Sequence, residues 1–342
     1  MSALLQIQDV SVHFPIRKGL LQRQVGVVRA VDSVTLELKK GEAFGLVGES
    51  GCGKTTLARA VLRLVDPISG IISFDGTNIS ALTTKGLAPF RKRIAAIFQD
   101  PFSSLNPRQK SGQIIAEVLQ VHHYEGEIKE RVVELLSICG LTPRFADLYP
   151  HEMSGGQRQR VGIARALALD PELIVCDEAV SALDVSIQAQ IINLLEELRV
   201  KFGLTYLFIG HDLSVVRHLC DRIAVMYLGR IMETGTAEEL FDTPKHPYTK
   251  ALINAVPAPN FVTDETPKSE TLKGEIPSPL APPRGCVFHT RCPIAFDRCS
   301  KVVPEITRLG KTQAAACFAL SNSEAPLQPK PKPTLTLTRR RP

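Results

Sequence analysis

One stretch of nine residues limits the fold more than any other: GESGCGKTT, residues 48–56. It follows a short apolar run, EAFGLV, and precedes TTLARAVLRLV, whose apolar residues recur on one helical face. In a loop of the pattern G-x-x-x-x-G-K-[ST] between a strand and a helix, successive backbone N–H groups point inward at phosphate oxygens. We therefore expect an α/β fold that binds a nucleotide.

The predicted phosphate-binding residues are consecutive along this loop. They are Gly48, Glu49, Ser50, Gly51, Cys52, Gly53, Lys54, Thr55 and Thr56. The glycines let the backbone fold around the phosphates, Lys54 supplies a positive charge to the β and γ phosphates, and Thr55 offers its hydroxyl to Mg²⁺. The positive end of the following helix also favours an anion.

A second motif, LIVCDE at residues 173–178, ends in two adjacent carboxylates. Four apolar residues precede them, which places Asp177 and Glu178 at the carboxyl end of a buried strand, where α/β proteins bind ligands. Asp177 is predicted to hold Mg²⁺ through its water shell, and Glu178 to polarise the water that attacks the γ-phosphate. A solvated loop could carry the same two acids, but the phosphate-binding loop favours the catalytic interpretation.

The third motif is MSGGQRQRVGIARALALDP, residues 153–171. Ser154 is a suitable helix N-cap, and Gly155 and Gly156 would let a phosphate approach the free N–H groups closely. Together with Gln157, these residues resemble the signature motif of ABC-type ATPases, and the surrounding motifs agree in order and spacing. The resemblance implies a P-loop NTPase fold with an antiparallel β subdomain and a helical subdomain at about residues 102–165.

The resemblance also assigns roles to residues outside these three motifs. Gln99 matches the Q-loop, which senses Mg²⁺ and the γ-phosphate, and Asp184 matches the D-loop. His211 in FIGHD matches the switch histidine, so the implied catalytic set is Glu178, His211 and Gln99. Phe14 is the candidate aromatic that stacks on adenine, with a core position as the alternative.

Two further implications concern the metal and the partner cassette. The implied Mg²⁺ residues are Thr55, Gln99 and Asp177. ABC cassettes pair head to tail, so the signature residues are expected to face the ATP of the partner. This chain has Ala179 where the family usually has proline after the catalytic glutamate. Alanine loosens the turn but removes no catalytic atom, so we expect activity to survive.

The branch of the family is indicated by four stretches: 98–115, 181–190, 246–253 and 274–293. They resemble the ATP-binding subunits of bacterial dipeptide and oligopeptide importers, most of all their F-type subunit. The resemblance implies a heterodimer with a second ATPase, two transmembrane permeases and an extracytoplasmic binding protein. Related importers carry nickel, glutathione or oligosaccharides, so the cargo stays open.

Composition bears on the location and on the other function classes. No apolar run is long enough for a membrane span and no signal peptide is evident, so we expect a peripheral protein on the cytoplasmic face of the inner membrane. A nucleic-acid ATPase would need a basic groove with stacking aromatics, whereas the net charge is only +6 and tryptophan is absent. A regulatory cassette would show broken motifs, and here they are intact.

The chain is predicted to divide into a nucleotide-binding domain (1–256), a C-terminal extension (257–322) and a disordered tail (323–342). Within the extension, EIPSPLAPPRG has four prolines in eleven residues and is interpreted as a linker. The tail alternates proline with polar and basic residues. The segment after the linker has too few apolar residues to form much of a core.

Four cysteines follow the linker: Cys286, Cys292, Cys299 and Cys317. Disulfides are rare in cytosol, whereas four thiolates suit a [4Fe–4S] cluster, which members of the resembled family with this pattern are described as carrying. Zinc is the alternative, with His289 as a competing ligand, although the spacing lacks a tight C-x2-4-C pair. Unligated thiols are the third interpretation, and a structural or docking role is expected in each case.

Overall fold

A computed structural model of the chain describes residues 3–19, 23–99, 104–255 and 274–320. Among these residues, the central element is an eight-stranded sheet with the order β11-β12-β10-β9-β3-β8-β7-β6. Its parallel strands are β3 (Ala43–Val47), β6 (Ile94–Ile97), β7 (Leu173–Asp177), β8 (Thr205–Ile209) and β9 (Arg222–Tyr227). β10 (Arg230–Thr236) pairs antiparallel with β9 through the turn at Gly229.

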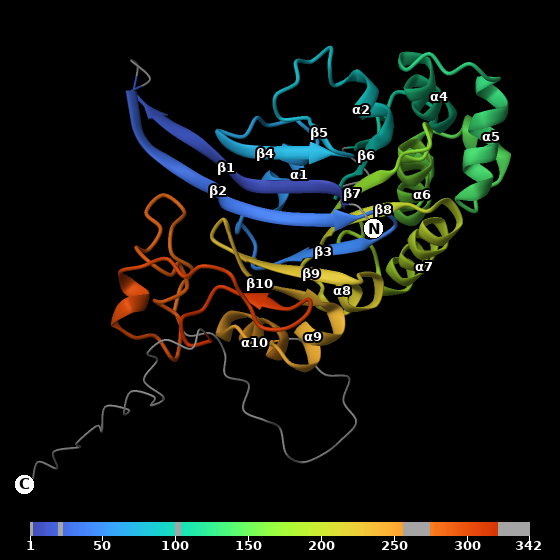
Figure 1. Ribbon diagram of the computed structural model, residues 1–342. Coiled ribbons are helices and arrows are strands. Elements are labelled where there is room, and N and C mark those ends of the chain that lie inside the picture. The colour runs from blue at the N-terminus through green and yellow to red at the C-terminus, as the bar shows by residue number, and fades with distance from the viewer. Residues whose placement is uncertain (1–2, 20–22, 100–103, 256–273, 321–342) are drawn as a thin grey trace, which may run out of the picture.

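A second, antiparallel sheet of four strands forms a separate layer (Figure 1). Its strands are β1 (Ala3–Lys18), β2 (Arg23–Lys39), β4 (Ser69–Phe74) and β5 (Thr77–Asn78). Leu5 and Ile7 on β1 are fully buried, because alternate residues of a strand face the same side of its sheet. The helix α1 (Lys54–Val61) contacts strands of both sheets, so the P-loop that precedes it is anchored where the two layers meet.

Helices cover the remaining surface of the main sheet, and α4, α5 and α6 form a group at one end of the molecule (Figure 1). The helices are α2 (Ala88–Arg93), α4 (Ser111–Val121), α5 (Ile128–Ile138), α6 (Gly155–Ala166), α7 (Val185–Phe202), α8 (Leu213–Leu219), α9 (Ala237–Asp242) and α10 (Pro247–Asn254), with 3-10 turns η1 (Pro143–Asp147), η2 (Pro150–Glu152) and η3 (Asp297–Ser300). α7 is capped at its C-terminus by Gly203, whose φ of 64° lies in the left-handed region that favours glycine.

Alternate residues of the central strands enter two different cores. On β7, Leu173 and Val175 face the core shared with the antiparallel sheet. Ile174 and Cys176 face the core shared with the helices. This alternation leaves the carboxyl ends of the strands, where Asp177 lies, at the edge of a sheet buried on both faces. The expected ABC-type α/β fold is confirmed.

The segment after the proline linker is built into the body, which the sequence did not indicate. Its strand β12 (Ala314–Ala315) pairs with β10, and β11 (Thr307–Arg308) pairs with β12. Phe288 is fully buried in the core that the helices share with the sheet. Phe288 thus packs against Tyr227 and Tyr248 of the larger domain, while Phe296 and Phe318 of the segment contact each other. The boundary near 257 and the predicted tail 323–342 lie outside the described residues.

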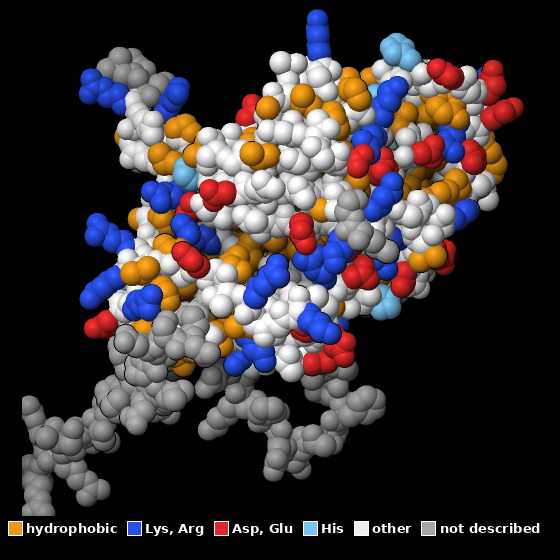
Figure 2. Space-filling model, viewed as in Figure 1, with side chains coloured by type: hydrophobic (Ala, Val, Ile, Leu, Met, Phe, Trp, Pro, Cys, Tyr) orange, Lys and Arg blue, Asp and Glu red, His pale blue; other side chains and the backbone are white. Residues whose placement is uncertain are grey.

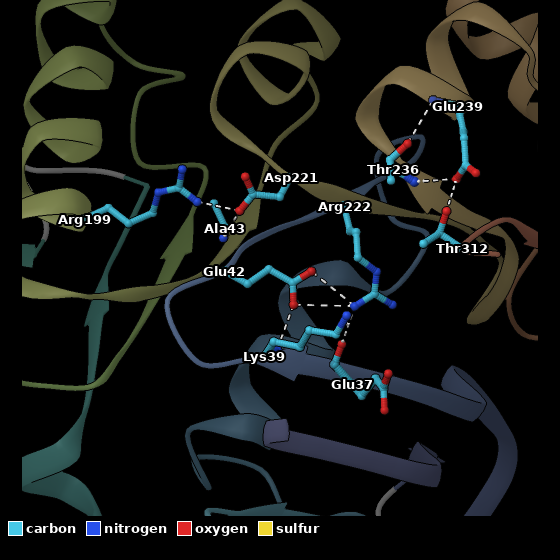
Figure 3. A network of polar contacts seen from close by, with 10 residues as sticks. All are labelled: Glu37, Lys39, Glu42, Ala43, Arg199, Asp221, Arg222, Thr236, Glu239 and Thr312. Atoms are coloured by element: carbon cyan, nitrogen blue, oxygen red, sulfur yellow. Dashed lines mark hydrogen bonds and ion pairs between the residues drawn. The ribbon is translucent and has the colours of Figure 1, made fainter. Parts of the chain in front are cut away.

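Polar contacts tie the sheets and this segment together (Figure 3). Arg222 Nη1 lies 3.1 Å from Glu42 Oε1, which links β9 to the turn before β3. Asp221 accepts a hydrogen bond from the Ala43 backbone N–H at 2.9 Å. In the C-terminal segment, the Thr312 hydroxyl donates to Glu239 Oε2 at 2.6 Å. The first two contacts hold the start of β9 to the start of β3, and the third holds the C-terminal segment to α9.

The surface has mixed charge. On the face shown in Figure 2, Lys and Arg side chains are interspersed with Asp and Glu instead of forming one basic groove. In the described ranges, no helix has the length and apolar character needed to cross a membrane.

Candidate active site

The P-loop holds its lysine inward. The Lys54 ammonium is buried and donates hydrogen bonds to the carbonyl oxygens of Gly48 at 2.8 Å and Glu49 at 3.1 Å. Gly53 has a φ of 110°, and a Cβ there would collide with the carbonyl oxygen of Ala30, so the loop requires glycine at this position. A charged amino group therefore sits inside a glycine-built loop at the N-terminal end of α1, which is the arrangement that favours a phosphate.

The two residues predicted to hold Mg²⁺ at the end of β7 and the start of α1 are in contact. Thr55 Oγ1 donates to Asp177 Oδ1 at 3.1 Å. Burial raises the pKa of Asp177, and the neighbouring Glu178 raises it further, whereas Thr55, Arg59 and Lys54 lower it. A bound cation would favour the ionised carboxylate, and hard oxygen donors of this kind are what Mg²⁺ prefers. The residues present thus fit a magnesium ion.

Two of the predicted catalytic side chains converge on a carboxylate oxygen of the third, Glu178. Gln99 Nε2 donates to Glu178 Oε2 at 2.8 Å, and His211 Nδ1 lies 3.6 Å from the same oxygen. The backbone N–H of Glu178 donates to the carbonyl of Ile209 at 2.9 Å, and Glu178 has a φ of 50°. The turn after β7 is therefore fixed against the end of β8, which brings Glu178 and His211 together.

A cavity of about 620 Å³ opens beside these residues and is lined by Thr55, Gln99 and Asp177. Arg59 and Arg165 also line it, which makes its wall basic. Glu178 and His211 line a smaller cavity of about 60 Å³. The hydrogen bond between Gln99 and Glu178 links the residues of one cavity to those of the other.

The signature residues cap α6. Ser154 Oγ accepts a hydrogen bond from the Gln157 backbone N–H at 3.3 Å, and Gln157 Oε1 accepts one from the Ser154 N–H at 2.9 Å. This reciprocal pair is a capping box. Packing also favours glycine at position 156, because a Cβ there would lie 2.5 Å from Ile187 Cγ2 on α7. Ser154 and Asp184 are exposed and line neither cavity.

Phe14 lies on β1, paired with Val28 of β2, and is 40% exposed. The alternative interpretation, a core position, does not fit this exposure. The ring is free to contact a ligand on the surface of the antiparallel sheet.

Sequence reasoning gave no role to two residues that contact the P-loop, Arg291 and Tyr248. Both bind Glu49, Arg291 through its guanidinium and Tyr248 through its hydroxyl. They lie in the stretches HPYTKALI and GCVFHTRCP, which marked the family branch but gave no partner. Nothing in their local pattern could point to a residue some 200 positions earlier.

The four C-terminal cysteines line one small cavity together with Phe288 and His289. Burial raises the pKa of Cys286 to about 11 and that of Cys292 to about 12. His289 is turned to a backbone carbonyl, with Nδ1 2.8 Å from the oxygen of Cys286. Within the described residues, no group of three or more His, Cys, Asp or Glu is spaced to hold a metal ion. The cysteines are free thiols, so a disulfide is not formed.

The fold and the site together define a P-loop ATPase of the ABC class. Residues 31–181 match the family model of the ABC transporter, and residues 232–299 match that of the oligopeptide/dipeptide transporter C-terminal region. The oligopeptide transport ATP-binding protein AppF of Bacillus subtilis is 54% identical over 321 residues, covering 93% of this chain and 98% of AppF. OppF of Escherichia coli is 50% identical over 306 residues, covering 88% and 92%. The chain belongs to the ABC transporter family, among its oligopeptide transport ATP-binding proteins.

Solved structures show the same cassette. The post-hydrolysis dimer of the ATP-binding cassette MJ0796 bound to ADP and Pi has a TM-score of 0.61 and 29% identity, covering 68% of this chain and 98% of that one. CbiO1 of Clostridium perfringens, part of the transporter complex cbiONQ, has a TM-score of 0.61 and 27% identity, covering 71% and 92%.

Proposed function

We propose that this chain is the ATP-hydrolysing subunit that energises a bacterial importer of dipeptides or oligopeptides, at the cytoplasmic face of the inner membrane. The observation that carries the ATPase role is the convergence of Gln99 and His211 on Glu178, beside the contact between Thr55 and Asp177. The peptide branch rests on relatives that the chain matches over almost their whole length and on the matching C-terminal region.

In this proposal residues 48–56 bind the phosphates and Phe14 stacks on the adenine. Mg²⁺ would be held by Thr55, Gln99 and Asp177, where it neutralises developing charge on the phosphates. Glu178 orients the attacking water and accepts its proton, and His211 contacts the γ-phosphate. The contribution of the chain is positioning and electrostatic stabilisation, since no covalent intermediate is required.

Ser154 of the signature motif and Asp184 of the D-loop are exposed, and they fit a second cassette in head-to-tail arrangement. Ser154 and Gly155 would then contact the ATP bound to the P-loop of the partner, and Asp184 would lie at the joint. Support comes from the exposure of Ser154 and Asp184 and from Val185 beside Asp184, which is 84% exposed. The similar cassette MJ0796 also forms a dimer, in a post-hydrolysis state bound to ADP and Pi. We propose a heterodimer with a second ATPase, seated on two permeases that receive substrate from an extracytoplasmic binding protein.

The proposed function predicts that ATP hydrolysis depends on the membrane partners. The wild-type chain with its second ATPase and both permeases should hydrolyse ATP faster than the chain alone, because docking closes the two cassettes around ATP. The measurement is phosphate release with and without the permeases, with DNA and RNA added in parallel samples. Stimulation by nucleic acid but not by the permeases would contradict the importer role and favour the alternative of a nucleic-acid ATPase.

We propose further that Cys286, Cys292, Cys299 and Cys317 ligate a [4Fe–4S] cluster, with zinc as the alternative. The support is that all four line one cavity although they come from separate turns of the segment. Their spacing in the structure is not that of a ready metal site, so ligation would require the thiols to draw together. Because burial raises the pKa values of Cys286, Cys292 and Cys317, binding would release protons. The group would fasten the segment and take no part in hydrolysis.

The cluster proposal predicts a brown protein after anaerobic purification, with absorbance near about 400 nm and about four irons per chain. The Cys292→Ser variant should lose the absorbance and the iron. The Cys139→Ser variant, which alters a buried thiol of the helical region, should keep the absorbance and the iron. Colourless wild-type protein without iron would contradict the cluster. Bound zinc by elemental analysis would favour the alternative.

A further inference from the structure

The P-loop is held from outside by Arg291 and Tyr248. Arg291 Nη1 lies 2.6 Å from Glu49 Oε2, and its Nη2 lies 3.0 Å from Glu49 Oε1. Such a two-pronged pair fixes both the position and the orientation of the carboxylate. The Tyr248 hydroxyl accepts a hydrogen bond from the Glu49 backbone N–H at 2.9 Å. One P-loop residue is therefore bound through its side chain and its backbone by the region that follows β10.

The ion pair between Arg291 and Glu49 is largely shielded from water. The side chain of Arg291 is 5% exposed and that of Glu49 is 22% exposed. The guanidinium also lies 5.8 Å from the ring centre of Tyr227, and its Nη1 is 3.4 Å from the Tyr227 hydroxyl. The pKa of Arg291 is raised by its bond to Glu49, so the arginine stays charged. Little solvent is available to screen either charge if its partner is removed.

Glu49 places a carboxylate in the loop that is proposed to bind the polyanion ATP. Its carbonyl oxygen is 3.1 Å from Lys54 Nζ, so its carboxylate belongs to a residue in direct contact with the phosphate-binding lysine. Without a counter-charge, this carboxylate would repel the phosphates of ATP and weaken their attraction to Lys54. Arg291 occupies both carboxylate oxygens and cancels this charge.

We propose that Arg291 is a positioning residue for ATP binding, which acts by neutralising Glu49 so that the P-loop presents a net positive charge to the phosphates. Arg291 directly precedes Cys292. The cysteine-bearing segment thereby becomes part of the nucleotide site. The inference rests on the proposed function, because it supposes that the loop binds ATP.

A merely structural role would be to fasten the segment to the body, but other contacts already do so. Gln313 Nε2 donates to Glu233 Oε1 at 2.9 Å and to the Thr243 carbonyl at 3.1 Å. β12 pairs with β10, and Phe288 is fully buried. The Gln313→Ala variant is therefore the matched control: it weakens the docking of the segment without changing charge near the P-loop.

The test compares dissociation constants of MgATP and MgADP, by calorimetry on the full-length chain. We expect Arg291→Gln to weaken MgATP binding about tenfold, because the charge of Glu49 is left uncompensated. The loss should be smaller for MgADP, which carries less negative charge, and should shrink at high salt. The double variant E49Q/R291Q should bind MgATP several-fold more tightly than Arg291→Gln, because it no longer carries the uncompensated carboxylate.

Thermal unfolding of each variant shows whether a loss of MgATP binding is accompanied by a loss of stability. If Gln313→Ala weakens MgATP binding as much as Arg291→Gln does, or if E49Q/R291Q binds MgATP no better than Arg291→Gln does, the ion pair serves docking only and the proposal is overturned. If the wild type and the Arg291→Gln variant bind MgATP equally well, the proposal about Arg291 is wrong while the proposed function stands. A wild-type chain that binds MgATP no better than the Lys54→Ala variant would overturn the proposed function and the inference with it.

Discussion

Replacing Glu178 by glutamine is expected to lower kcat for ATP hydrolysis by at least about a hundredfold, the usual contribution of a general base. Glutamine keeps the size of the side chain and an oxygen that can accept the hydrogen bond now given by Gln99 at 2.8 Å. It cannot take a proton from the attacking water. The rate should therefore fall while MgATP binding stays within about twofold of wild type.

The measurement is steady-state phosphate release by the assembled transporter, with MgATP binding determined on the same preparation. Glu196→Gln is a suitable control, because Glu196 lies on α7, pairs with His218 at 3.6 Å and lines neither cavity. A Glu178→Gln variant that retains most of its kcat would show that another group activates the water.

The Lys54→Ala variant is expected to weaken MgATP binding at least about a hundredfold. The substitution removes the buried charge that bonds the carbonyl oxygens of Gly48 and Glu49 inside the loop. A charge-assisted contact to phosphate contributes about 1.5–3 kcal/mol, and the P-loop also loses a donor that organises its backbone. Both losses lower the affinity of the loop for MgATP.

Equilibrium binding of MgATP checks this prediction, with Lys40→Ala as the charge-matched control. Lys40 is exposed and pairs with Glu172 at the surface, 3.0 Å away, where a salt bridge contributes little. Its variant should bind MgATP as the wild type does. Equal affinity of the Lys54→Ala variant and the wild-type protein for MgATP would contradict the proposed nucleotide site.

Local features of the fold follow from the sequence because each depends on neighbouring residues. The capping box of Ser154 and Gln157, the C-cap at Gly203 and the β-turn at Gly229 all need only a few adjacent positions. The same holds for the position of Asp177 at the end of a buried strand. Local patterns of this kind predicted the P-loop from residues 48–56 and the two carboxylates from residues 173–178.

Contacts between distant segments could not be predicted in this way. Glu49 and Arg291 are 242 residues apart, and nothing in either local pattern specifies the other. The segment after the proline linker was expected to build little core, since few of its residues are apolar. The structure shows that Phe288 packs into the larger domain and that β12 extends its sheet. Burial against an existing core needs far fewer apolar residues than an independent core does.

The central claim is that ATP hydrolysis by this chain drives peptide import, and transport by the reconstituted assembly tests it most directly. Vesicles would contain both permeases, this chain and the second ATPase, with the binding protein and a labelled oligopeptide on the opposite side from ATP. We predict peptide uptake that requires ATP and is lost in the Glu178→Gln variant. Uptake that continues unchanged in that variant, or ATP-driven uptake of nickel, glutathione or an oligosaccharide but of no peptide, would contradict the account.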